Sequence, residues 1–160
     1  MGTYVLGTVV KAVGTALFAA ASLRRTQQYD QITEGMQDYP TLQVWPAANT
    51  GTSWNSQTDR LTFGGAVGPD LAIQKLSVKE YPIYADLYVQ QRAHIGESMS
   101  KLVATIDELE NILDTQPCPP FGLDSLFSFQ WRWDHATFDY GNVIYVGARF
   151  VITIRMGVEH

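Results

Sequence analysis

Two runs near the end of the chain alternate apolar and polar residues almost without exception. Side chains of a strand alternate between its two faces, so each run predicts a strand with one buried face. The sequence Asp139-Tyr140-Gly141-Asn142 between the runs is a turn signal and predicts a long antiparallel hairpin. The apolar positions are Phe127, Phe129, Trp131 and Trp133 in the first run, and Val146, Ala148, Phe150, Ile152, Ile154 and Met156 in the second.

The aromatic positions of the first run admit two interpretations. They could form a stacking platform for bases or sugars, which needs polar or basic side chains beside the rings. The polar residues of this run fall on the opposite face of the strand, so we expect the aromatic side chains to pack in the core.

Two other stretches repeat their apolar residues with the period of a helix. The first helix is expected from about Thr3 to Thr33, and the second from about His94 to Thr115, before Pro117. The apolar stretch from Val5 to Leu23 resembles a signal peptide, but no positive charge precedes it, and it is short for a membrane span. We therefore interpret it as an amphipathic helix of a soluble domain.

The middle of the chain predicts two strands separated by a long loop. Thr41 to Trp45 reads as a short strand, and residues 71–90 alternate again, with Pro82 indicating a bulge or an edge position. Residues 47–70 are rich in Gly, Ser, Thr and Asn and predict a long flexible loop, in which residues 60–63 could form a further short strand.

The expected fold is α+β, in one domain spanning residues 1–160. It consists of an antiparallel sheet of about four strands with two helices packed on one face, in the order α-β-β-α-β-β.

Composition narrows the classes of function. The net charge of −5 argues against a protein that grips nucleic-acid phosphates, although it suits a surface past which a polyanion slides. Cys118 is the one cysteine, which excludes an intrachain disulfide and a thiolate metal site and indicates a reducing compartment. A charged fraction of only 17% leaves much neutral or apolar surface and favours an assembly component.

The sequence holds few candidates for catalysis. His135 beside Asp134, at an expected strand end, is the best acid–base pair, but neighbours in a strand point to opposite faces. Asp86, Asp134 and Asp139 could form a carboxylate cluster, although they come from separate segments. The glycine-rich residues 64–69 lack the Lys-Ser/Thr ending of a phosphate-binding loop. We predict that the protein is not an enzyme and uses no cofactor or metal.

The order of these elements resembles the tail terminator (tail completion) proteins of long-tailed bacteriophages. The segments that carry the resemblance are Tyr39-Pro40-Thr41-Leu42-Gln43-Val44, the long loop, Tyr81-Pro82-Ile83-Tyr84-Ala85-Asp86-Leu87-Tyr88-Val89, the helix over 94–115, and the closing hairpin with Ile152-Thr153-Ile154-Arg155.

This resemblance implies a structural virion protein of the tail neck, assembled in the host cytoplasm. It would form a hexameric ring that caps the tail tube, stops tube polymerisation and joins the tail to the head connector. The partners would be other copies of the chain, the tail tube protein and a head-completion or connector protein, with DNA passing through the lumen without specific binding and no membrane involved.

Contacts in such a ring are expected in the 47–70 loop and around the 134–143 hairpin turn. Trp54 in a polar loop could pack back onto the domain or serve as an anchor in a partner's pocket, where tryptophan is enriched. The alternatives are another head–tail neck component (a head-closure or tail-tube protein), a small-ligand-binding module or enzyme, and a membrane-associated protein. The candidate interface residues are Trp54, Arg60, Phe63, Asp134, His135, Asp139, Tyr140 and Arg149.

Overall fold

The computed structural model describes residues 6–30, 40–47, 52–55, 76–91, 95–123, 126–140 and 143–159. Within these ranges the side chains at 52–55, 76–77, 90–91, 95–98, 127, 140, 143 and 158–159 lie outside the description. The expected strand at residues 60–63 also lies outside it.

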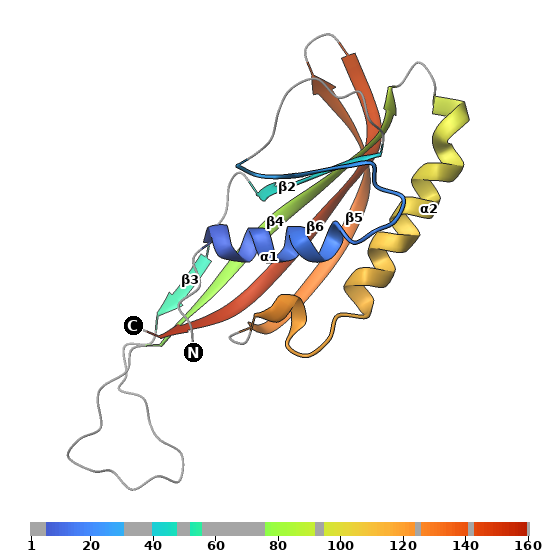
Figure 1. Cartoon of the computed structure of the whole chain (residues 1–160). Coiled ribbons are helices and arrows are strands. Elements are labelled where there is room, and N and C mark those ends of the chain that lie inside the picture. Colours follow the sequence, from blue (N-terminus) through green and yellow to red (C-terminus); the bar gives the residue numbers. More distant parts are fainter. Residues whose placement is uncertain are drawn as a thin grey trace, which may run out of the picture.

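The described chain is an α+β fold with one twisted sheet (Figure 1). Its elements, in chain order, are α1 (Leu6–Leu17), β1 (Arg25–Gln28), β2 (Thr41–Pro46), β3 (Thr52–Asn55), β4 (Leu76–Gln91), α2 (Ile95–Asp114), a short 3-10 helix η2 (Pro120–Gly122), β5 (Leu126–Tyr140) and β6 (Val143–Glu159). The strands follow the order β1-β2-β4-β6-β5, and β3 pairs with β4 beyond the end of β2. The sheet turns so far that β1 and β2 run at a large angle to β5 and β6.

The terminal hairpin is confirmed and is longer than expected. β5 and β6 pair antiparallel from Leu126↔Met156 to Tyr140↔Val143, and β6 pairs along its other side with β4. All six apolar positions predicted for one face of β6 are buried, and Phe129 and Trp131 pack against the same core. Fully burying side chains such as Phe150 or Ile152 stabilises the fold by about 1.5–3 kcal/mol each, so this hairpin anchors the domain.

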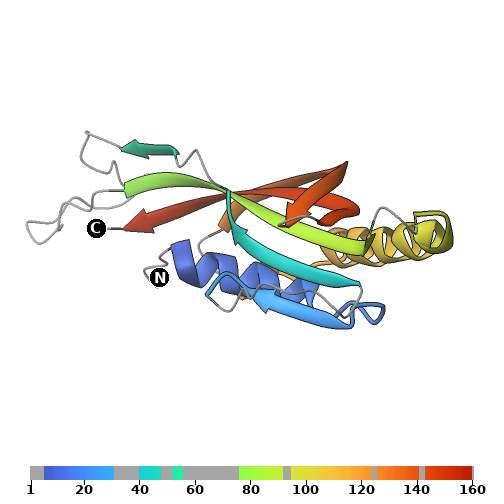
Figure 2. The ribbon, with the colours of Figure 1, turned by 90° about the horizontal axis from the view of Figure 1, so that it is seen from above.

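Both helices cover one face of the sheet, as Figure 2 also shows. Val9, Val13 and Leu17 of α1 are buried against it, as are Leu102, Leu109 and Leu113 of α2. The second helix is confirmed to within a residue at each end. Neither described helix combines the length and hydrophobicity needed to cross a bilayer.

The first helix is much shorter than the predicted span of 3–33, and the expected strand count and order were wrong. α1 ends at Leu17, a turn follows, and Arg25–Gln28 forms β1, parallel to β2. The sequence Thr26-Gln27-Gln28 is polar and shows no apolar alternation from which a strand could be predicted. This four-residue edge strand owes its conformation to backbone pairing with β2. β3 falls inside the expected 47–70 loop and pairs with β4 for the same reason.

Pro82 occupies a special place in β4. Its carbonyl accepts a hydrogen bond of 3.1 Å from the Ala47 amide, directly beyond the end of β2. β3 starts its pairing only at Glu80. The missing N–H of proline therefore falls in the gap between β2 and β3, a local edge inside a central strand. The irregularity of β4 lies elsewhere, between Tyr88 and Gln90.

Candidate interaction face of the sheet

The sheet face opposite the helices, here called the second face, carries a row of polar side chains across five strands. The register aligns Gln27, Gln43, Asp86, Arg149 and Asp134 on β1, β2, β4, β6 and β5. Gln43 donates a hydrogen bond of 2.7 Å from Nε2 to Oε1 of Gln27, and both side chains are buried. Alternation in each strand produces this row, because apolar neighbours such as Ala85 and Phe150 turn to the helices.

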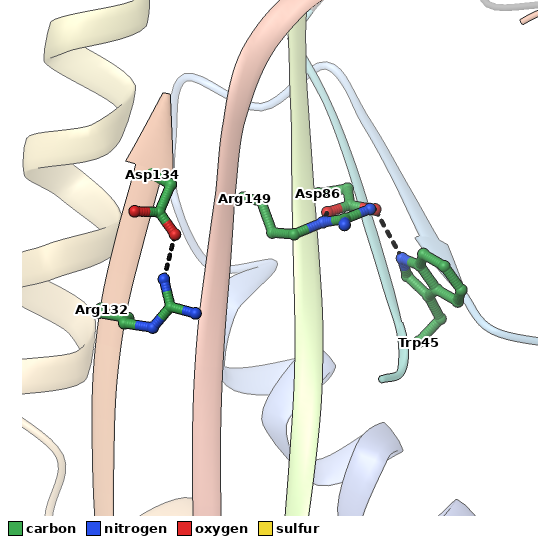
Figure 3. Close-up of polar contacts among 5 residues, drawn as sticks. All are labelled: Trp45, Asp86, Arg132, Asp134 and Arg149. Atoms are coloured by element: carbon green, nitrogen blue, oxygen red, sulfur yellow. Dashed lines mark hydrogen bonds and ion pairs between the residues drawn. The ribbon is translucent and has the colours of Figure 1, made fainter. Parts of the chain in front are cut away.

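Asp86 is the centre of the row and is only 1% exposed. Arg149 donates to it from Nε to Oδ1 at 2.7 Å and from Nη2 to Oδ2 at 3.1 Å. The indole Nε1 of Trp45 donates a third hydrogen bond to Oδ2, at 2.7 Å (Figure 3). One carboxylate thus joins three strands, and the hydrogen bond to Asp86 raises the pKa of Arg149 above its usual value.

Aromatic rings surround the guanidinium of Arg149. Its Cζ lies 4.3 Å from the ring centre of Tyr84, 5.5 Å from that of Phe138 and 5.7 Å from that of Trp45. Planar guanidinium groups stack well on such rings. Arg149 is therefore a fixed cation, matched by Asp86, and not a mobile group for acid–base chemistry.

A second small aromatic cluster continues toward the hairpin turn. Tyr88, Phe138 and Tyr145 are buried against one another, with ring centres 4.4 Å apart for Tyr88 and Phe138. Tyr88 lies at the irregularity of β4, so the cluster fills the space where the strand changes register. It gives this end of the second face an apolar floor.

The candidate acid–base pair of Asp134 and His135 does not form, as the alternation of side chains in a strand indicated; only its expected position at a strand end was wrong. Both residues lie inside β5 and not at a strand end, so their side chains point to opposite faces. Asp134 instead forms an exposed ion pair with Arg132, two residues away on the same face (Figure 3). His135 is exposed on the other face.

The three aspartates of the imagined carboxylate cluster are only partly brought together. Asp86 and Asp134 flank Arg149 in the same cross-strand row, but each has its own arginine partner. Asp139 lies five residues farther along β5 and is exposed. Within the described residues, no three His, Cys, Asp or Glu side chains are placed to hold a metal ion.

Only some of the predicted interface residues have side chains that the structure describes. Asp134, His135 and Asp139 lie on β5, and Arg149 lies in the polar row. Trp54 lies on β3 and Tyr140 on β5, but the structure does not describe their side chains. Arg60 and Phe63 lie wholly outside the described residues. Sequence reasoning missed Trp45 and Asp86 as the centre of the row; the available signal was an aspartate in the middle of an apolar strand.

A shallow polar hollow of about 190 Å³ lies on the second face, farther from the hairpin turn. Glu80, Ser128, Gln130, Thr153 and Arg155 contribute to its lining, and Arg155 donates a hydrogen bond of 3.0 Å to Glu80. Its polar groups come from β4, β5 and β6. The second face therefore combines a neutralised charge network with polar and aromatic surface, a composition typical of a contact surface.

No protein-family model matches the sequence of this chain, and the search of curated proteins found no match either.

Proposed function

We propose that this protein is a structural subunit of a bacteriophage neck, of the tail-terminator kind, that forms a hexameric ring at the end of the tail tube. The first support is the resemblance of single segments, chiefly the strand over residues 81–89, the helix that follows it and the closing hairpin. A sheet built on a long terminal hairpin, with two helices on one face, agrees with that proposal at the level of the α+β fold.

The observation that carries the proposal is that the two edges of the sheet are unlike. β1 is a parallel edge strand of four residues, whereas β5 is an antiparallel edge strand of 15 residues. Among the described residues, neither pairs with a further strand. A head-to-tail ring needs two different surfaces that complement each other, and unlike edges provide them.

The long edge also carries exposed apolar surface. Trp133 on β5 is 38% exposed, and its indole donates a hydrogen bond of 2.5 Å to Glu110 of α2. Tryptophan is enriched in the buried centres of protein interfaces. An edge strand that displays it is suited to contact a neighbouring subunit.

Charge is consistent with DNA passing through the ring. The net charge of −5 gives each subunit an excess of carboxylates, and six subunits would multiply that excess. The second face neutralises its arginines at short range, through Asp86, Asp134 and Glu80. The lumen of a ring with this charge would repel DNA phosphates instead of binding them.

The test has two stages. The absolute mass of the purified protein by light scattering should be about 107 kDa, six times the 17.8 kDa of one chain, and negative-stain images should show rings. Tail tubes grown from tube protein should then remain short, with a ring at one end. Tubes grown alone and tubes grown with heat-unfolded protein are the controls, and tubes that elongate freely beside the folded protein would overturn the proposal.

A further inference from the structure

The outer edge of β5 is open along the strand. β5 ends the strand order, and within the part of the chain that the structure describes, residues 128–139 form no backbone–backbone hydrogen bond beyond their ladder with β6. Residues 126–140 contain no proline and no lysine, two residues that commonly protect an edge strand from pairing. A long edge without such protection is a template for a strand of another chain.

Pro82 reveals which backbone groups of β5 point to the open edge. The Pro82 carbonyl bonds the Ala47 amide, on the side of β4 that faces β2 and away from β6. Thr153 of β6 lies opposite Pro82, so its own backbone groups turn the other way, to Gln130 of β5. Along β5 every second residue bonds β6 as Gln130 does, and the residues between them direct N–H and C=O outward. These outward residues are Phe129, Trp131, Trp133, His135, Thr137 and Asp139.

Trp133 is the middle residue of β5, which spans 15 residues from Leu126 to Tyr140. Its backbone belongs to the outward set, and its side chain is 38% exposed. If β5 pairs antiparallel with β5 of a second copy and Trp133 lies opposite itself, the two strands overlap over their whole length. Outward residues then face outward residues, as the hydrogen bonds of an antiparallel ladder require. The exposed indole lies at the centre of the contact, where tryptophan is enriched.

The charges on either side of Trp133 are complementary in this register. Arg132 and Asp134 are exposed by 66% and 60% at their side chains and lie on the second face (Figure 3). Each Arg132 would lie opposite Asp134 of the other copy, and the ion pair within each strand would remain, so positive and negative groups alternate around the centre. Opposite charges across a ladder stabilise it, and like charges destabilise it. Centring the contact on Arg132 or on Asp134 would place like charges opposite each other, so the charges select Trp133.

We infer that β5 pairs antiparallel with β5 of a second copy of this chain, about a two-fold axis at Trp133. The contact is symmetric, because the same edge serves on both copies. It goes beyond the ring proposed above and does not depend on it. Both contacts use the β5 edge, so a subunit takes part in one or the other. A ring needs six subunits and this dimer needs two, so dilution favours the dimer by mass action. The dimer is the form in which subunits outside a ring cover their long edge.

Two charge variants test the contact and its register. Arg132→Asp and Asp134→Arg each place like charges opposite each other on both sides of the axis, so each alone should dimerise at least about tenfold more weakly than the wild type. Mixed in equal amounts, the two variants should pair with each other, because the carboxylates of one copy then face the guanidinium groups of the other. Neither variant retains the ion pair within the strand, so that pair cannot explain the recovery.

Sedimentation equilibrium over a dilution series measures the dimer, whose mass is twice 17.8 kDa, about 36 kDa. The matched control is Arg155→Asp on β6, which makes the same change of charge at an exposed arginine of the second face. Arg155 does not lie on the β5 edge, so this variant should dimerise as tightly as the wild type. The melting temperature of each variant shows that it is folded.

A pair of cysteine variants locates the axis independently of charge. In a Cys118→Ser background, which removes the native thiol, Trp133→Cys would place a thiol opposite its own copy, with the two Cα atoms about 5.5 Å apart. Thr137→Cys is the control, because its backbone also points outward but its copy lies eight residues along the ladder, about 27 Å away. A short bismaleimide should link Trp133→Cys into dimers at least about tenfold faster than Thr137→Cys.

The remaining outcomes overturn the inference or separate it from the ring. Charge variants that dimerise like the wild type, a mixture that stays monomeric, or equal linking at positions 133 and 137 would each remove the contact. A wild-type protein that passes on dilution from ring to monomer without a dimer would keep the ring and remove this contact. A dimer that forms as described, in a protein that gives no ring with or without tail tubes, would keep the contact and overturn the ring proposal.

Discussion

Asp86 on β4 and Arg149 on β6 form a bidentate ion pair whose carboxylate is almost wholly buried and whose cation is one-third exposed. This difference in exposure determines how much stability is lost when each residue is substituted. Removing the cation leaves a buried carboxylate with Trp45 as its remaining donor in this network, whereas removing the carboxylate leaves a cation that water still reaches.

Arg149→Met should therefore lower the free energy of unfolding by about 3 kcal/mol, and Asp86→Asn by less. The double variant should lose about 1–3 kcal/mol less than the sum of the two, because the partners are coupled. Urea denaturation of the four proteins measures all three values. The control is Arg132→Met, which breaks an exposed ion pair and should change stability by no more than about 1 kcal/mol; additive effects would contradict the coupling.

Gly147 on β6 should tolerate no side chain. A Cβ at this position would lie 1.6 Å from the Leu87 carbonyl oxygen, because the irregularity of β4 brings the two backbones together. Gly147→Ala must push β4 away from β6, so we expect a loss of about 3 kcal/mol or more and a lower melting temperature.

The comparison for Gly147→Ala is Gly7→Ala on α1. There a Cβ would lie 2.7 Å from the Tyr29 hydroxyl, the far end of a side chain that is 37% exposed and free to rotate away. Replacing glycine by alanine inside a helix is itself favourable by about 0.5–1 kcal/mol. Equal melting temperatures for the two variants would show that the strands separate easily.

The sequence was sufficient to predict the elements whose buried residues recur at a regular spacing. The alternation in β6 and the stripe of α2 predicted both elements closely, because each buries one continuous face. β1 and β3 were not predictable in this way. Four-residue strands such as Thr52–Asn55 owe their conformation to hydrogen bonds with a distant partner, and nothing in their side chains records that partner.

The candidate site followed the same division. Arg149 could be selected as an interface candidate from its position in a predicted strand, and the alternation placed it on the face opposite the apolar residues. The identity of its partner depends on the register of β4 against β6, which a sequence of alternating residues leaves undetermined. The turn that follows the early end of α1 likewise makes a tertiary contact, between Ser22 and Glu108, that the sequence does not reveal.

Glu108 ties α2 to the turn that follows α1. Its carboxylate accepts one hydrogen bond of 2.7 Å from the Ser22 hydroxyl and another of 3.0 Å from the Ser22 amide. Glu108→Ala should cost about 1–2 kcal/mol, because a charged acceptor is lost and the amide is left with water as its partner. Asp107→Ala, one residue earlier and exposed, should change stability by less than about 0.5 kcal/mol.

Ser22→Ala tests whether Glu108 acts through this turn. In wild-type protein it should destabilise by about 0.5–1.5 kcal/mol, whereas in the Glu108→Ala background it should have little further effect. Differential scanning calorimetry on the four proteins provides the comparison. Independent effects of the two substitutions would mean that Glu108 stabilises the fold by some other contact.

Lys11 and Asp30 join α1 to the residues after β1 through an exposed ion pair of 2.9 Å. The hydrogen bond from Lys11 lowers the pKa of Asp30 below 3.8, and the same bond raises the pKa of Lys11 above 10.5. A lowered carboxyl pKa stabilises the fold above pH 3.8, and that contribution disappears as the pH falls through the lowered value. A raised lysine pKa stabilises it below pH 10.5 and loses its effect as the pH rises through the raised value.

The pair should therefore act across the whole range between those two limits, and NMR can follow it directly. The Asp30 carboxyl carbon should titrate with a midpoint below 3.8 in the wild-type protein and return toward 3.8 in Lys11→Met. Lys101→Met on α2 is the control and should leave the midpoint unchanged. In about 1 M salt, where the Debye length falls to about 3 Å, the wild-type midpoint should also rise. A midpoint that changes with neither Lys11→Met nor salt would show that Lys11 is not the partner of Asp30 in solution.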